Sequence, residues 1–133
     1  MANNAPRIMI AGTGSGCGKT MVTLAVLRAM QRRNIPLAAF KCGPDYIDPM
    51  FHKAVLGIPS RNLDLFFISE REVRGQIVRS IPQNGIGVIE GVMGFYDGVS
   101  GTTDTASAAH LARETGTPAI LVVRPKGQSL SLA

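Results

Sequence analysis

The chain has 133 residues, of which 45% are hydrophobic and 17% charged, so it suits one globular domain with a hydrophobic core and is not a disordered tail. No run approaches the ~18 apolar residues of a membrane span, and the apolar run near the N-terminus is too short for a signal peptide, so we expect a cytoplasmic protein without membrane contact. The net charge of +5 comes from dispersed Lys and Arg residues without interleaved aromatic residues, which argues against nucleic acid binding. The positive charge is then either a chance excess of basic surface residues or a means of attracting an anionic substrate.

The first predicted element is a short buried strand at Arg7–Ala11, followed by a loop rich in glycine. The loop, Gly12-Thr13-Gly14-Ser15-Gly16-Cys17-Gly18, precedes Lys19-Thr20 at the start of a predicted helix that extends to Arg33. Strand, glycine loop and helix together form the setting in which backbone N–H groups and the helix dipole bind phosphate. One detail departs from the strict P-loop pattern, because Thr13 stands where that pattern has a glycine.

We therefore predict a nucleoside triphosphate site in this loop. Lys19 is expected to contact the β- and γ-phosphates, and the Thr20 hydroxyl to bind Mg²⁺. The alternative, a loop that is merely flexible, gives no reason for a lysine at the start of the helix. The helix is apolar nearly all round from Met21 to Leu27, so we expect it to be buried. The residues expected to bind ATP are Gly14, Ser15, Gly16, Cys17, Gly18, Lys19 and Thr20.

Apolar runs and helical patterns alternate along the rest of the chain. This alternation predicts an α/β fold, a P-loop NTPase-like and mainly parallel sheet of about four strands with helices on both faces. One further helix begins at the capping box Ser69-Glu70-Arg71-Glu72, and another ends at Gly116, with Pro118 behind it. The remaining strands are expected at Leu37–Lys41, Ile86–Glu90 and Ala119–Val123, and the helices from about residue 69 to 80 and from about 105 to 116.

Functional residues gather at the carboxyl ends of parallel strands, and two of these ends carry acidic groups. The second strand runs into Lys41-Cys42-Gly43-Pro44-Asp45-Tyr46-Ile47-Asp48-Pro49, a stiff loop that presents Asp45 and Asp48. Such a loop can hold Mg²⁺ and position a substrate, although Asp48 could equally cap a helix after Pro49. The third strand ends at Glu90, the best single candidate to hold the metal or its water, and a glycine-spaced loop brings Asp97 to the same edge.

Three segments carry a resemblance to a known family. The segments 41–49, Arg61-Asn62-Leu63-Asp64 and Glu90-Gly91-Val92-Met93-Gly94-Phe95-Tyr96-Asp97-Gly98 resemble the signature segments of the cobyrinic acid a,c-diamide synthase family. With the P-loop they cover nearly the whole chain in the family's order. The resemblance implies an enzyme of cobalamin biosynthesis that uses ATP and Mg²⁺ to activate the a and c carboxylates of a corrin as acyl phosphates. Ammonia from glutamine then converts these to amides.

The resemblance also implies roles for individual residues. Lys19 and Lys41 would stabilise the charge on the transferring phosphoryl group, as expected for such chemistry. Asp45 and Glu90 would serve the phosphoryl-transfer centre and, with Thr20, the metal. Tyr46 could equally be a core or hinge aromatic. The residues expected to line or order the substrate side are Tyr46, Asp48, Asp64 and Asp97.

Members of the family are several times longer than this chain. They continue into a C-terminal glutamine amidotransferase domain. We therefore expect residues 1–133 to be the N-terminal, ATP-binding part of the synthetase domain and to be inactive alone. An exposed sheet edge would let this part associate, as in a homodimer. Cys17 and Cys42 are expected to be small buried thiols without a role in glutamine hydrolysis. Arg124 stands where the family usually has an aspartate after the fourth strand.

Two other classes of protein have a similar P-loop. A dethiobiotin synthetase-like ligase also activates a carboxyl-type intermediate, but the segments at 43–48 and 90–94 argue against it. An ATPase switch of the partitioning type, which dimerises on DNA or membrane, carries an extra lysine where this chain has Gly14. Within the amidase family, hydrogenobyrinic acid or a nickel sirohydrochlorin are alternatives to cobyrinic acid.

Overall fold

Five parallel strands form the centre of the molecule. The computed structural model describes residues 5–45 and 47–132, and for residue 48 the backbone only. The strands are β1 (Arg7–Gly12), β2 (Leu37–Cys42), β3 (Ser60–Leu63), β4 (Ile86–Glu90) and β5 (Ala119–Val122), in the spatial order β3-β2-β4-β1-β5. The helices are α1 (Lys19–Arg32), α2 (Ile47–Leu56), α3 (Glu70–Ser80) and α4 (Ala108–Thr115), followed by a short 3₁₀ helix, η1 (Leu130–Leu132).

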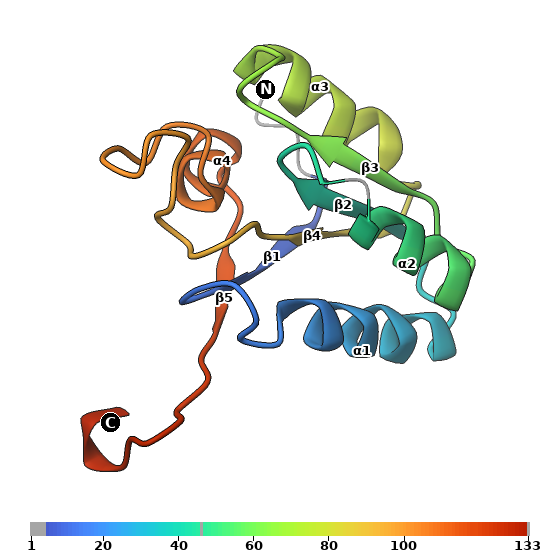
Figure 1. The fold of residues 1–133 in the computed structure, drawn as a ribbon. Coiled ribbons are helices and arrows are strands. Elements are labelled where there is room, and N and C mark those ends of the chain that lie inside the picture. The colour runs from blue at the N-terminus through green and yellow to red at the C-terminus, as the bar shows by residue number, and fades with distance from the viewer. Residues whose placement is uncertain (1–4, 46, 133) are drawn as a thin grey trace.

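Helices cover both faces of the sheet, as the sequence predicts (Figure 1). α1 and α2 lie on one face, where Leu27 and Ile58 pack with strand residues such as Val88. α3 and α4 lie on the other face, where Ile77 and Leu111 belong to a second apolar cluster. This two-sided cover explains why the central strands are mostly apolar, with their charged residues near the strand ends.

The strand register places the carboxyl ends of three strands beside one another. Glu90, the last residue of β4, pairs with Lys41 of β2 on one side and with Ile10 of β1 on the other. β1 ends two residues later at Gly12, where the glycine-rich loop begins. Parallel pairing therefore brings the loop, Lys41 and Glu90 to one edge of the sheet.

The structure corrects three sequence-based expectations. The sheet has five strands rather than about four, because the short polar segment Ser60–Leu63 pairs with β2. A helix begins at Ile47, before Pro49 rather than after it, since the Asp45 carboxylate accepts the Ile47 N–H. The last predicted helix begins at Ala108 rather than near residue 105, with Ser107 as its cap.

The expectation of a fully buried first helix is also wrong. Only Lys19, Thr23 and Leu27 of α1 are buried, and the Met21 side chain is 72% exposed. The three buried residues are four apart, so they form the single stripe that a helix presents to a sheet. Among the described residues, no helix combines the length and the apolar character needed to cross a bilayer.

Candidate functional site

The carboxylate of Glu90 lies at the centre of a buried polar cluster. Glu90 has no exposed surface and Lys41 is only 3% exposed. One carboxylate oxygen, Oε1, accepts a hydrogen bond of 2.6 Å from the Thr20 hydroxyl and lies 3.4 Å from Lys41 Nζ. The other oxygen, Oε2, lies 2.9 Å from His52 Nε2. A carboxylate so buried is stable only because charged and hydrogen-bonding groups surround it.

Lys41 connects this carboxylate to neighbouring loops. Its Nζ donates to the Gly91 carbonyl at 2.9 Å, and Asp45 Oδ2 lies 3.7 Å away. Asp45 is about one-third exposed, and its other oxygen caps α2 through the Ile47 N–H. The structure therefore groups Lys41, Asp45, Glu90 and Thr20, which sequence reasoning placed together.

The glycine-rich loop has the backbone that a phosphate cradle needs. Gly18 precedes α1 with φ = 107°, a conformation that favours glycine. A Cβ on Gly12 would overlap the Sγ of Cys17 and lie 2.9 Å from Lys19 Cγ, so a larger residue there would displace the side chains of Cys17 and Lys19. Lys19 is buried, and its Nζ donates to the Gly14 carbonyl at 2.7 Å across the loop. The lysine thus lies against the loop's own backbone.

The donor atoms fit Mg²⁺. This ion prefers oxygen ligands and binds proteins through one or two carboxylates while keeping several waters. The Thr20 hydroxyl gives its hydrogen to Glu90 and so keeps its oxygen lone pairs for a cation. The carboxylates of Glu90 and of the part-exposed Asp45 both lie near Lys41 Nζ, at 3.4 and 3.7 Å.

Comparison with known proteins agrees with this geometry. The family model CbiA, described as the CobQ/CobB/MinD/ParA nucleotide binding domain, matches residues 8–100. The chain belongs to this family. Its five-stranded parallel sheet with helices on both faces is the P-loop NTPase-like fold of the CbiA family.

Curated relatives extend the likeness beyond the family model. Proteins named cobyrinate a,c-diamide synthase from Salmonella typhimurium, Thermoplasma volcanium and Clostridium acetobutylicum are 45%, 48% and 49% identical to the chain, over 100%, 96% and 94% of it. These matches confirm the resemblance to the cobyrinic acid a,c-diamide synthase family that the sequence motifs suggest. The CbiA-family chain spans 29%, 28% and 28% of the length of these relatives.

Two acidic residues expected near the substrate have structural contacts of their own. Asp64 follows β3, and its Oδ1 accepts the Phe66 N–H at 3.0 Å. Its Oδ2 is buried and has no hydrogen-bond partner within the described ranges. Asp97 Oδ2 accepts the Gly94 N–H at 2.8 Å and so shapes the loop after β4. Tyr46 lies outside the described residues, and so does the side chain of Asp48.

The loop shaped by Asp97 is joined to the glycine-rich loop. The Phe95 N–H donates to the Gly12 carbonyl at 2.8 Å, and the Phe95 carbonyl accepts the Ala109 N–H from α4 at 2.8 Å. A Cβ on Gly94 would meet both Asp97 Oδ2 and the Thr13 carbonyl. Asp97 therefore orders a segment that borders the candidate nucleotide site.

Sequence reasoning missed His52. This side chain is fully buried in α2, and Nδ1 lies 3.1 Å from Ser60 Oγ while Nε2 faces Glu90. The available signal was a histidine on the helix that follows the aspartate-rich loop. Helical periodicity alone does not tell which strand end such a residue meets, so the pairing with Glu90 requires the tertiary structure.

A second cluster of potential metal ligands joins α3 to α4. Among the described residues, the ligand atoms of Glu70, His110 and Glu114 lie within 4.8 Å of one another. Arg74 lies 3.7 Å from each carboxylate and already supplies positive charge. His110 Nδ1 accepts the Ala106 N–H, so its Nε2 carries the ring hydrogen and has no lone pair for a metal. This cluster is an ion-pair network.

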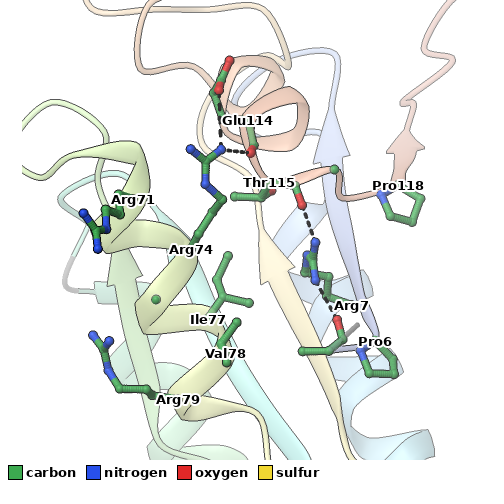
Figure 2. Close-up of a pocket in the computed structure, with 13 residues that line it drawn as sticks. Pro6, Arg7, Arg71, Arg74, Ile77, Val78, Arg79, Glu114, Thr115 and Pro118 are labelled. Carbon is green, nitrogen blue, oxygen red and sulfur yellow. Dashed lines mark hydrogen bonds and ion pairs between the residues drawn. The ribbon is translucent and has the colours of Figure 1, made fainter. Parts of the chain in front are cut away.

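A cavity opens at the end of the sheet opposite the cluster around Glu90. It has a volume of about 1380 Å³ and opens between α3 and α4, near the start of β1 (Figure 2). Arginines surround it, but Arg74 donates to the Glu114 carbonyl, and Arg7 donates to the Thr115 carbonyl and the Thr117 hydroxyl. These contacts join α3 to α4 and β1 to the end of α4, so we assign the cavity no chemistry.

The two cysteines are expected to differ sharply in reactivity. Burial raises the pKa of the Cys42 thiol to about 12, so the reactive thiolate is nearly absent at neutral pH. Cys17 lies part-exposed in the glycine-rich loop. Titration of the native chain with a thiol reagent should modify Cys17 and leave Cys42 unmodified until the protein unfolds, with Mg-ATP slowing the reaction at Cys17. Equal rates at both thiols would contradict this arrangement.

Proposed function

We propose that the chain binds Mg-ATP in its glycine-rich loop and forms the ATP-binding part of an enzyme that amidates the a and c carboxylates of cobyrinic acid, or of a related tetrapyrrole. The observation that carries the proposal is the buried cluster of Thr20, Lys41 and Glu90 beside that loop. Relatives named cobyrinate a,c-diamide synthase support the choice of substrate.

Amidation requires activation because a carboxylate has no good leaving group. In the proposed reaction a substrate carboxylate oxygen attacks the γ-phosphorus of ATP, the bond to the β–γ bridging oxygen breaks, and ADP leaves. Ammonia then attacks the carbonyl carbon of the acyl phosphate, and phosphate leaves as the amide loses a proton. A glutamine amidotransferase domain outside this chain would supply the ammonia.

The residues of this chain would position and stabilise the charges of the first step. Backbone N–H groups of the loop and Lys19 Nζ would bind the β- and γ-phosphates, where negative charge is concentrated. Lys41 would stabilise the transferring phosphoryl group from the side of β2. Thr20, Glu90 and Asp45 would hold Mg²⁺, which supplies charge neutralisation between the phosphates.

The substrate side is proposed to lie at the loops after β2, β3 and β4. Tyr46, Asp48, Asp64 and Asp97 would line or order this region. Asp64 Oδ2 is buried and has no hydrogen-bond partner among the described residues, which supports a role beyond local structure because a buried acceptor without a partner costs stability. The loop that Asp97 orders borders the glycine-rich loop, so a substrate on it would lie near the phosphates.

A chimera tests this function. Residues 1–133 would replace the matching segment of the Thermoplasma volcanium relative, which is 48% identical and supplies the remaining length. With Mg-ATP, cobyrinic acid and ammonium ions, we expect ADP and the diamide in stoichiometric amounts, and neither product from a Lys19→Ala chimera. A folded chimera that cleaves no ATP, beside an active parent, would contradict the proposal. ATP-dependent dimerisation of the chain on DNA or lipid would favour an ATPase switch of the partitioning type instead.

A further inference from the structure

The two oxygens of Glu90 face different partners. Oε1 meets the Thr20 hydroxyl and Lys41 Nζ, on the side of the glycine-rich loop. Oε2 meets His52 Nε2 at 2.9 Å, and both side chains have no exposed surface. Because every one of these partners donates, the carboxylate accepts from both sides and its plane is fixed by them.

The imidazole of His52 is held in turn from its far side. Nδ1 lies 3.1 Å from the hydroxyl of Ser60, the first residue of β3. The Glu90 carboxylate only accepts, so Nε2 carries a hydrogen and donates it to Glu90, while Nδ1 shares a second hydrogen bond with the Ser60 hydroxyl. A continuous chain of hydrogen bonds thus runs from β3 through α2 to the end of β4.

We propose that His52 is a positioning residue, which holds Glu90 through Oε2 so that Oε1 stays directed at Thr20 and the metal site. This inference rests on the proposed function, in which Glu90 serves Mg²⁺. Groups that orient a metal-binding side chain commonly contribute about 10–100-fold to metal affinity or activity. Without the His52 hydrogen bond, the buried Oε2 would lose that donor, and the carboxylate would rotate toward the remaining donors.

Three variants separate positioning from mere structural support. His52→Asn is too short to reach Glu90, whereas the longer amide of His52→Gln carries an N–H near the place of Nε2. His110→Asn is the matched control, because it changes the other histidine of the chain, which lies in α4 outside the cluster around Glu90. ATP affinity would be measured by calorimetry at rising Mg²⁺ concentrations and also in EDTA, after circular dichroism has shown that each variant is folded.

The positioning role predicts a selective loss. His52→Asn should raise the Mg²⁺ concentration for half-maximal ATP binding by about 10–100-fold, and leave the affinity in EDTA unchanged. His52→Gln should recover most of the Mg²⁺ dependence, and His110→Asn should behave like the unaltered chain. An unchanged Mg²⁺ dependence in folded His52→Asn, or an equal loss with and without Mg²⁺, would overturn the proposal.

A second measurement needs neither ATP nor a folded variant. Long-range ¹H–¹⁵N spectra of the unaltered chain should show the His52 hydrogen on Nε2 and slow exchange of that hydrogen with water. An Nε2 without a hydrogen, or a rapidly exchanging Nε2 hydrogen, would overturn the inference. If the chain binds no Mg-ATP, the proposed function fails in this chain, and so does the positioning role that rests on it. The spectra would still decide whether His52 contacts Glu90.

Discussion

Replacing Lys19 by alanine should abolish measurable ATP binding. The ammonium group of Lys19 is buried in the loop and already donates to the Gly14 carbonyl, so it is available at the phosphate position without entering from solvent. Hydrogen bonds to charged groups contribute about 1.5–3 kcal/mol each, and contacts with two phosphates therefore correspond to roughly 100-fold or more in affinity. Isothermal calorimetry with Mg-ATP measures this loss directly.

Lys53→Ala is a suitable control for this change. Lys53 also carries a positive charge, but it lies exposed in the last turn of α2. Its removal lowers the net charge by the same amount and should change ATP affinity by less than about 3-fold, since exposed charges act weakly through water. If the two variants weaken binding equally, Lys19 acts only through overall charge and the proposed phosphate contact is wrong.

Replacing Glu90 by glutamine should be among the most destabilising of the substitutions that change side-chain volume as little. Thr20, Lys41 and His52 all donate toward Glu90, whereas glutamine offers one acceptor oxygen and turns an amide N–H₂ toward a donor. Lys41, at 3% exposure, also loses a buried counter-charge. Breaking a buried ion pair on one side costs about 3–5 kcal/mol, a large part of the total stability of a small domain. Urea unfolding followed by circular dichroism gives this value.

A second variant identifies the cause of that loss. Removing the lysine charge as well, in Glu90→Gln with Lys41→Met, should recover part of the stability, because the buried charge left by the single change is gone. The same double variant should still fail to bind ATP in a Mg²⁺-dependent way. A loss below about 1 kcal/mol for Glu90→Gln alone would show that the cluster is not held by the buried pair.

The sequence was sufficient for the parts of the site that follow from local patterns. The glycine-rich loop, the apolar runs ending at Lys41 and Glu90, and the parallel order of strands were enough to place Thr20, Lys41 and Glu90 at one sheet edge. The register of β2 against β4 then makes Lys41 and Glu90 direct neighbours. These features depend on short segments that have only a few possible arrangements.

Other features depend on tertiary contacts and were not predictable. β3 is short and polar, and it is a strand because it pairs with β2 and because the Asn62 amide donates to the Gly43 and Asp45 carbonyls. The exposure of Met21 depends on which side of α1 faces the sheet. His52 is recognised only when α2 is in place above Glu90. In each case the local sequence allows several arrangements, and packing selects one.

The central claim is that the glycine-rich loop and the cluster around Glu90 together hold Mg-ATP. The most direct test is a crystal structure of the chain with Mg²⁺ and a non-hydrolysable ATP analogue. We expect the triphosphate within the loop at residues 12–18, Lys19 Nζ on its phosphates, and the metal on Thr20 Oγ1 with Glu90 beside it. A triphosphate bound elsewhere, for example in the arginine-lined cavity of Figure 2, or a metal distant from Thr20, would contradict the account.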